Sequence, residues 1–352
     1  MPNTPTPSPA DPDTPAALLR LCPAHAATPL LDLPRLAAAL GVSAVLAKDE
    51  GRRPLGSFKA LGGVYAGLRA LARAAGSSVA ALLDPARPRA ALPALVCASD
   101  GNHGLAVAAA ARLAGARARV FLPGIVPEAR AARIAAKGAE VVRVPGTYDD
   151  AVRAAADAAR DDGAILVADT GETPDDPVVR DVMAGYGVIA QELAAQFAGS
   201  PAPTHLFVQA GVGGLAAAMA DGLHERMASP ARVVVVEPDA AACVAPALRA
   251  GRPVRVGGTL DTAAEMLSCG EASAPALPAL LRAGATGLAV PEGALLDAPG
   301  FLAAHGGPPT TPSGAAGLAG LRHALADPAL VRSLDLGPAS RVLLLVTEAP
   351  PA

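Results

Sequence analysis

The chain has only three lysines among its 29 basic residues, and one of them, Lys59, lies in a setting typical of a reactive amine. Small residues surround it in the segment Gly56–Gly63, which reads GSFKALGG. Arginine stays protonated and forms no imine, so a chain that uses arginine almost everywhere yet keeps this lysine suggests nitrogen chemistry. The simplest such chemistry is an imine with a carbonyl cofactor. The alternative is a lysine in the first turn of a helix that points into solvent.

A second motif, Gly211-Val212-Gly213-Gly214, follows an apolar stretch and opens a helical one. Its glycines let backbone N–H groups approach an anion, and a helix start favours negative charge, so the motif predicts a phosphate site. No Lys-Ser/Thr pair follows, which excludes a nucleotide P-loop. With Ala216 and with Glu237 at the end of the next apolar stretch, it also fits a loose dinucleotide-binding pattern. A dehydrogenase and a tight turn without ligand therefore stay open.

Two polar segments complete the candidate motifs. Ser99-Asp100-Gly101-Asn102-His103-Gly104 places four polar side chains beside two glycines. An Asn amide can donate to a phenolate-type oxygen and an Asp carboxylate can take a proton, which suits a loop at the edge of a cofactor. In Thr310–Ala316, the hydroxyl of Ser313 can hydrogen-bond a ring nitrogen. The structural alternatives are helix N-caps at Asp100, Asn102 or Ser313.

Each motif follows a short apolar run that predicts a strand. The strand candidates are Val45–Ala47, Ala94–Ala98, Arg119–Leu122, Val141–Val144, Ile165–Ala168, Leu206–Gln209, Val233–Val236 and Val342–Val346. Stretches rich in Ala, Leu and Arg predict helices over Phe58–Ala74, His103–Ala114, Glu128–Ala136, Tyr148–Arg160, Pro177–Gln196, Gly213–Met227 and Ser313–Ala326. Apolar strands that alternate with helices predict an α/β protein with parallel sheets covered on both faces. Ligands then bind at the carboxyl ends of the strands.

Composition narrows the class of protein. The net charge of −3 and the absence of any run of Lys/Arg argue against nucleic-acid binding. The four cysteines show no CxxC spacing and no His/Cys cluster suggests a metal. No apolar run approaches the roughly 20 residues of a membrane helix, and no secretory signal opens the chain, so we expect a cytoplasmic protein. A chain with 52% hydrophobic but 2% aromatic residues predicts a core of small side chains and close helix–sheet packing.

The order of elements predicts two domains and a tail. Residues 1–16 are rich in proline and are expected to be disordered. Residues 17–70 and 178–352 are expected to form a large domain, and residues 71–177 a small α/β domain. Four strand–helix repeats between about Ala94 and Asp169 would give the small domain its own sheet.

In their order along the chain, these motifs resemble those of fold-type II pyridoxal-phosphate enzymes, the relatives of tryptophan synthase β and threonine dehydratase. The matching segments are GSFKALGG, SDGNHG, GVGG, Val-Glu-Pro at 236–238 and PSGAAG at 312–317. The resemblance runs from about Thr28 to Glu348 and implies two parallel-sheet domains with a cofactor cleft between them. Within that superfamily the chain looks most like the diaminopropionate ammonia-lyases. The features that point there are Asp100, Tyr148-Asp149-Asp150, Asp169-Thr170 and Met266–Glu271.

The resemblance implies a role for each matched residue. Lys59 would carry pyridoxal 5'-phosphate, and Phe58, Asn102 and Ser313 would contact its ring. The phosphate would be bound by the backbone of Gly211, Val212, Gly213, Gly214 and Leu215. The catalytic residues would be Lys59, Asp100 and Asp169, and the residues near the substrate Ser99, Asp100, Tyr148, Asp169 and Thr170. The family's aromatic segment after Asp-Thr is replaced here by Gly171–Pro174, which leaves the exact amino acid open.

The implied activity is the β-elimination of D- or L-2,3-diaminopropionate to pyruvate and ammonia, in amino-acid catabolism, by a homodimer that needs no metal. A serine or threonine dehydratase, which eliminates water, is the nearest alternative, although Asp100 and Cys269-Gly270-Glu271 argue against it. An NAD-dependent oxidoreductase would explain the glycine loop and Glu237 but would leave Lys59 without a role. A protein that binds the cofactor without turnover is a third possibility.

Overall fold

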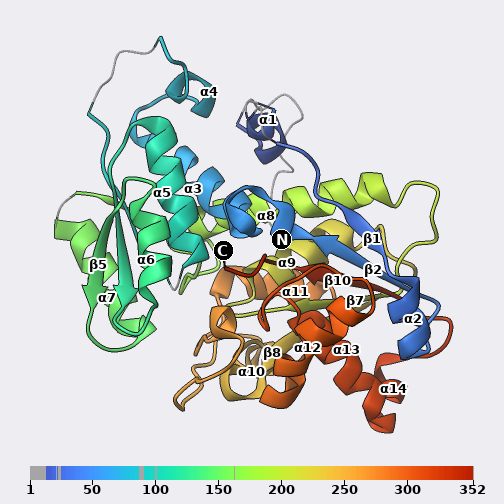
Figure 1. Cartoon of the computed structure of the whole chain (residues 1–352). Coiled ribbons are helices and arrows are strands. Elements are labelled where there is room, and N and C mark those ends of the chain that lie inside the picture. The colour runs from blue at the N-terminus through green and yellow to red at the C-terminus, as the bar shows by residue number, and fades with distance from the viewer. Residues whose placement is uncertain are drawn as a thin grey trace. The chain divides into compact units, whose positions relative to one another are not determined.

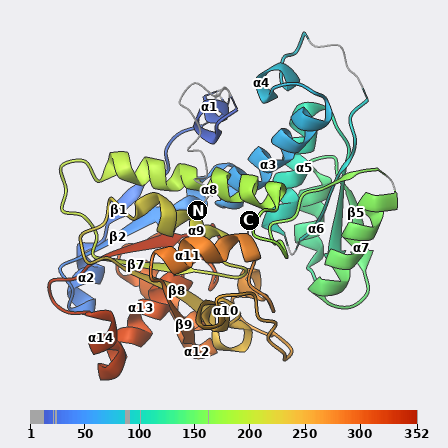
Figure 2. The same cartoon turned by 180° about the vertical axis from the view of Figure 1, so that it is seen from behind.

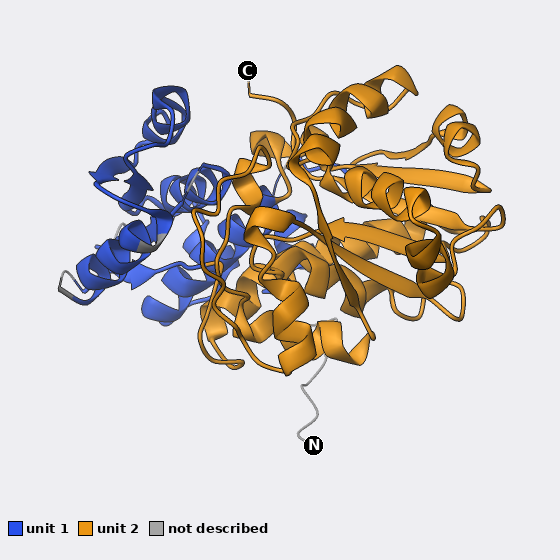
Figure 3. Ribbon diagram, turned by 90° about the horizontal axis from the view of Figure 1, so that it is seen from below, with its two compact units in different colours: residues 1–26, 59–168 blue, residues 27–58, 169–352 orange. Residues whose placement is uncertain are grey.

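The computed structural model describes residues 13–20, 22, 25–86, 91–99, 101–161 and 163–351. The chain divides into two compact units, shown in Figure 3. Unit 1 consists of residues 1–26 and 59–168, and unit 2 of residues 27–58 and 169–352. Each unit has its own β-sheet.

Unit 2 is built on a six-stranded sheet with the order β1-β2-β10-β7-β8-β9 (Figure 1). Its strands are β1 (Leu30–Asp32), β2 (Ala44–Asp49), β7 (His205–Gln209), β8 (Arg232–Pro238), β9 (Thr286–Val290) and β10 (Arg341–Val346). The edge strand β1 is antiparallel to β2, and the other pairs are parallel. The three strands β10, β7 and β8 are buried along almost their whole length, as expected for a parallel sheet covered on both faces.

Helices cover both faces of this sheet (Figures 1 and 2). One face carries α2 (Pro34–Leu40), α12 (Glu292–Ala304), α13 (Ala316–Ala326) and α14 (Pro328–Leu334). The other carries α8 (Pro177–Gln196), α9 (Gly214–Leu223), α10 (Val244–Ala250) and α11 (Leu277–Arg282).

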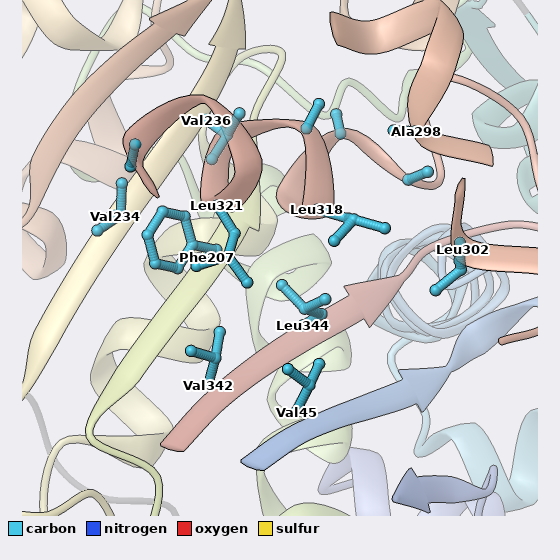
Figure 4. Packing of buried hydrophobic residues seen from close by; sticks show 14 of the residues in the cluster. Val45, Phe207, Val234, Val236, Ala298, Leu302, Leu318, Leu321, Val342 and Leu344 are labelled. Atoms are coloured by element: carbon cyan, nitrogen blue, oxygen red, sulfur yellow. The ribbon is translucent and has the colours of Figure 1, made fainter. Parts of the chain in front are cut away.

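The core under α13 is made of small and branched side chains. Phe207, Val234 and Val236 of the sheet meet Leu318 and Leu321 of the helix in Figure 4. The glycines of α13 allow this approach, because a Cβ on Gly320 would lie 2.4 Å from Val236 Cγ2. The close helix–sheet packing predicted from the composition is therefore confirmed in this part of the molecule.

Unit 1 contains a parallel four-stranded sheet with the order β5-β4-β3-β6. Its strands are β3 (Leu95–Ala98), β4 (Ala118–Pro123), β5 (Glu140–Val144) and β6 (Ile165–Leu166). Its helices are α1 (Pro15–Leu19), α3 (Lys59–Ala74), α4 (Val79–Leu82), α5 (Asn102–Ala114), α6 (Glu128–Ala135) and α7 (Tyr148–Asp161). Glycines again set the packing: a Cβ on Gly63 or Gly67 of α3 would lie 2.6 or 2.7 Å from Ala106 or Ala110 of α5.

Every predicted strand and helix occurs, with differences at the ends. Helix α9 ends at Leu223 rather than Met227, and α13 begins at Ala316 rather than Ser313 because residues 312–315 form a turn. Strand β6 has two residues instead of four. The sequence did not predict β1 and β9.

The division into units differs from the predicted domains at both junctions. Helix α3 belongs to unit 1, because Gly63 and Gly67 bring it against α5. Residues 169–177 belong to unit 2, where Gly171 N–H donates to Ser273 Oγ at 3.2 Å and Gly171 O accepts from Ala274 N–H at 2.9 Å. The domain bounds are therefore 59–168 for the smaller sheet rather than 71–177.

The predicted tail lies outside the described residues up to residue 12. Its last residues are described and are ordered by helix formation: Pro15 starts α1, and Thr14 Oγ1 accepts from Ala17 N–H at 3.2 Å as the N-cap. Asp13 Oδ1 accepts from Val79 N–H at 2.9 Å, which fixes this segment on unit 1. The expectation of disorder is therefore wrong for residues 13–16.

Candidate active site

Lys59 opens α3, and the residues just before it are held to the end of β10. Ser57 pairs with Glu348 in an antiparallel bridge, and Phe58 N–H donates to Thr347 O at 3.1 Å. The Phe58 ring packs on Tyr186, with the ring centroids 4.9 Å apart. Lys59 itself is half-buried, which argues against a lysine that simply points into solvent.

The segment before Lys59 rests on four ionised side chains removed from water, Lys48, Glu50, Arg53 and Glu192, here called the charged cluster. Arg53 donates to Glu50 at 2.6 and 2.9 Å and to Glu192 at 2.8 and 2.9 Å. Lys48 donates to Glu192 at 2.7 Å, so two positive charges balance two negative ones. Burial disfavours every charge here, but hydrogen bonds from Arg53 and Lys48 outweigh it and lower the pKa of Glu192.

A tight turn joins the charged cluster to Lys59. Leu55 has φ 72° and Gly56 has φ 80°, and Gly56 N–H donates to Arg53 O at 2.8 Å. Left-handed backbone at a leucine costs about 1–3 kcal/mol and persists only where the surroundings fix it. Arg53 fixes the turn on one side and the Ser57 bridge on the other, so Lys59 begins from a defined backbone position.

The glycine loop presents backbone donors at the start of α9. Gly213 has φ 97°, and the first helical bond runs from Ala217 N–H to Gly213 O at 2.9 Å. Within the described part of the chain, the N–H groups of Gly213, Gly214 and Leu215 have no acceptor. A Cβ on Gly211 would lie 2.9 Å from Cys269 Sγ, so the loop must be free of side chains there. This geometry suits an anion.

The side chain of Gln209 organises the segment that carries Ser313. Its Nε2 lies 3.0 Å from Ser313 O and Gly314 O, 3.2 Å from Leu345 O and 3.1 Å from Thr347 Oγ1. Gln209 is buried, and it joins the end of β7 to the end of β10 and to the turn before α13. These contacts with Ser313, Gly314, Leu345 and Thr347 are here called the amide cluster.

Ser313 does not cap α13, because the N-cap position belongs to Ala315. Its buried hydroxyl instead accepts from Met266 N–H at 3.1 Å. No described residue receives the proton of this hydroxyl, which leaves it available to an acceptor such as a ring nitrogen.

Glu237 has a structural role that excludes its use in a dinucleotide site. Its side chain is 0% exposed and accepts from the backbone N–H groups of Cys243, Val244 and Ala245 at 2.8, 2.6 and 2.8 Å. A carboxylate engaged in this way cannot bind a ribose hydroxyl, so the dehydrogenase alternative loses its acidic residue. Cys243 in turn donates from Sγ to Gly211 O at 3.4 Å, and the four cysteines are free thiols.

In unit 1, the SDGNHG loop is held by Ser99. Its buried Oγ accepts from Gly101 N–H at 2.9 Å and from Gly104 N–H at 2.8 Å, so Ser99 shapes the loop, although the sequence suggested a substrate contact. His103 Nε2 lies 2.8 Å from Val167 O, beyond the end of β6. Asn102 is the first residue of α5 and half-buried. Asp100 lies outside the described residues.

The remaining predicted residues follow strands of the two units. Tyr148 is half-buried at the start of α7 and packs against the cluster of Val96, Phe121 and Ala151 in unit 1. Asp169 and Thr170 are half-buried and belong to unit 2. Unit 2 thus brings Phe58, the glycine loop and Ser313 together through Gln209 and Thr347. Lys59, Ser99, Asn102 and Tyr148 belong to unit 1.

A family model described as "Pyridoxal-phosphate dependent enzyme" matches residues 21–348. The chain belongs to this family. The predicted pyridoxal 5'-phosphate cofactor and the α/β fold of fold type II are thereby confirmed.

The similar proteins of known name are lyases and dehydratases. The diaminopropionate ammonia-lyase of Salmonella typhimurium is 38% identical over 261 residues, which cover 71% of this chain and 65% of that protein. The Escherichia coli protein of the same name is 34% identical over 69% of this chain and 63% of its own length. The chain thus spans slightly less than two thirds of the curated relatives it matches.

Solved structures agree with this similarity. Holo diaminopropionate ammonia lyase from Escherichia coli superposes with a TM-score of 0.84 at 29% identity, covering 95% of this chain and 88% of that one. A bacterial threonine deaminase, from the source abbreviated T.th., gives a TM-score of 0.75 at 29% identity, covering 98% and 99%.

The described residues of this family member fit pyridoxal phosphate. The three N–H groups of Gly213, Gly214 and Leu215 offer donors for a phosphate, and glycines keep side chains out of the loop. The hydroxyl of Ser313 has a proton to donate. Among the described residues, no group of three or more His, Cys, Asp or Glu side chains could bind a metal, and no helix could cross a membrane.

Several contributors were missed by sequence reasoning. Arg53 and Glu192 are 139 residues apart, Gln209 looked like the last residue of a strand, and Ser273 lies in no motif. Only Arg53 carried a signal, since it stands six residues before Lys59.

Proposed function

We propose that the protein is a pyridoxal-phosphate-dependent ammonia-lyase that removes the 3-amino group of 2,3-diaminopropionate to give pyruvate and ammonia. The observation that carries the proposal is the similarity to diaminopropionate ammonia-lyases in both sequence and fold. The described residues support it, because a fixed turn leads into Lys59 and unit 2 supplies both a phosphate loop and the Ser313 hydroxyl.

Cofactor binding divides among the predicted residues. Lys59 is the amine that would carry the cofactor, and the backbone of Gly211 to Leu215 binds its phosphate. Phe58 and Asn102 contact the ring, and Ser313 donates to the ring nitrogen. When bound, pyridoxal phosphate makes the Cα–H of an attached amino acid acidic. A neutral hydroxyl at the ring nitrogen limits charge accumulation in the ring, which favours β-elimination over transamination.

Proton transfer would depend on two groups. The carboxylate of Asp100 takes the Cα proton from one face and Lys59 Nζ takes it from the other, which permits action on both enantiomers. Asp169, Thr170 and Tyr148 bind the substrate beside them. Replacing Asp100 by Asn should lower turnover by about 10²–10⁴-fold while the cofactor stays bound. Full activity of D100N on both enantiomers would show that Asp100 is not the base.

A serine or threonine dehydratase is the second candidate. It is favoured by similarity to the biosynthetic L-threonine dehydratase of Mycobacterium leprae, 37% identical over 263 residues, and by the departure from the lyase pattern at Gly171–Pro174. Steady-state rates on 2,3-diaminopropionate, serine and threonine decide between the two. A higher kcat/KM on either hydroxy amino acid would favour the dehydratase.

The decisive experiment uses the scarcity of lysine. Borohydride reduction of the protein with pyridoxal phosphate, followed by peptide mapping, should place the adduct on the Lys59 peptide. K59R should lose both the adduct and pyruvate formation, because a guanidinium forms no imine. The matched control K137R should keep both. An adduct on another lysine, or none, contradicts the proposal. The cytoplasmic homodimer is also proposed, and light scattering of the purified protein tests the dimer.

A further inference from the structure

A buried serine outside the motifs joins the phosphate loop to the segment that follows Asp169-Thr170. Ser273 is 0% exposed and precedes the short helix η5 (Ala274–Ala276). Its N–H donates to Val212 O at 2.9 Å, and its Oγ accepts from Gly171 N–H at 3.2 Å. Ala274 N–H donates back to Gly171 O at 2.9 Å. One residue therefore bonds two segments that lie 41 positions apart in the sequence, since 212 minus 171 is 41.

Packing makes this connection stiff on both sides. A Cβ on Gly171 would lie 3.2 Å from Asp176 Cβ and 3.3 Å from Val179 Cγ2, so Gly171 is set against the start of α8. Asp176 is itself fixed, because its Oδ1 caps α8 by accepting from Val179 N–H at 3.0 Å. A Cβ on Gly213 would lie 3.4 Å from Ala276 Cβ, so η5 also contacts the phosphate loop.

We propose that Ser273 is a positioning residue that fixes Asp169 and Thr170 relative to the phosphate loop. The inference rests on the proposed function, which assigns the substrate to the first segment and the cofactor phosphate to the second. Ser273 acts through Gly171 N–H and Val212 O rather than by touching either ligand. Removing the hydroxyl breaks the bond to Gly171 but leaves the main-chain bond to Val212 in place. The substrate segment should therefore loosen while the phosphate loop keeps its shape.

The test compares S273A with S340A. Ser340 is a matched control, because it is also a buried serine whose Oγ accepts a glycine N–H, that of Gly337 at 3.0 Å, at the opposite end of β10. In S273A we expect the KM for 2,3-diaminopropionate to rise about tenfold and amide hydrogen exchange in residues 169–176 to become about tenfold faster. The Kd for pyridoxal phosphate, from absorbance titration, should change by less than about threefold. S340A should leave all three quantities near the wild-type values.

Hydrogen exchange separates this inference from the proposed function, since it needs no turnover. A wild-type protein that is inert towards 2,3-diaminopropionate removes the proposed function, and exchange in residues 169–176 of S273A then decides the structural role alone. Unchanged exchange in those residues overturns the proposal. A loss of pyridoxal phosphate affinity as large as the rise in KM also overturns it, because the damage would then be general. Equal effects in S340A would do the same.

Discussion

The charged cluster and the amide cluster fix neighbouring segments of unit 2 by opposite means. The charged cluster sets the turn before Lys59 with two cations and two carboxylates, whereas the amide cluster sets the Ser313 segment with the neutral side chain of Gln209. Both are buried, and both segments bond to the end of β10 at Thr347. Ionised groups give strong and directional bonds, but each one depends on the others for its charge balance. The segment with the reactive lysine is therefore held more firmly and is more easily ruined.

The largest effect is expected from breaking the charged cluster. R53M leaves Glu50 and Glu192 opposite Lys48 alone, so one buried negative charge is uncompensated, and the free energy of unfolding should fall by about 3–5 kcal/mol. Urea denaturation measures the loss. The double variant R53M/E50Q restores the balance of charge and should be more stable than R53M. If the double variant is the less stable of the two, charge balance does not govern this cluster.

Glu237 tests an intermediate case, a single buried charge bonded only by neutral donors. Burial raises the pKa of Glu237 to about 7 from an ordinary 4.5, against the opposing effect of three backbone N–H donors. The folded protein therefore retains a proton that the unfolded chain has lost between these values, and stability should fall as pH rises through this window. The advantage of wild type over E237Q should shrink from about pH 5 to about pH 8, by at most about 1.4 kcal/mol per pH unit. A constant difference across that range would show that Glu237 does not titrate there.

Removing the amide cluster should cost less than removing Arg53. Q209L leaves four oxygen acceptors without their shared donor, and we expect a loss of about 1–3 kcal/mol in the free energy of unfolding. Q209E sharpens the comparison, since a carboxylate would face oxygen acceptors only and should be less stable than Q209L at neutral pH. Thermal unfolding of both variants measures the order. A loss in Q209L equal to that in R53M would remove the distinction between the clusters.

The smallest effect is expected at an exposed ion pair in the same unit. Arg282 and Asp221 lie 3.0 Å apart with both side chains 65% exposed. Solvent screens such a pair, so D221N should change the free energy of unfolding by no more than about 0.5 kcal/mol. Chemical denaturation at low and high salt checks this value. A loss of several kcal/mol would mean that burial is not what separates the charged cluster from ordinary ion pairs.

The fold was largely readable from the sequence, because buried parallel strands appear as apolar runs between helical stretches. The two strands that escaped prediction are short or contain glycine. β1 has three residues, and β9 includes Gly287, where a Cβ would lie 2.4 Å from Ala245 Cβ. Glycine is needed there for contact with another helix, and such a contact leaves no trace in local periodicity.

The site was only partly readable. Residue type and spacing identified Lys59, the glycine loop and Ser313, but not what holds them. The role of Gln209 depends on partners more than 100 positions away, from Ser313 to Thr347. Ser99 shows the reverse error, since its polar setting suggested a ligand while its hydroxyl is engaged by Gly101 and Gly104. Motifs identify chemistry, whereas the supporting bonds depend on tertiary structure.

The burial of Lys48 has a practical consequence for labelling. Its amine is bonded to Thr28 O, Glu192 and Gln196 at 2.7–2.9 Å and is 0% exposed, so acylating reagents cannot reach it in the folded state. Lys59 and Lys137 are then the side-chain amines left for an activated ester to modify. Protection of Lys59 by a bound ligand could be read directly by mass spectrometry against Lys137 as an internal standard, with no engineered tag.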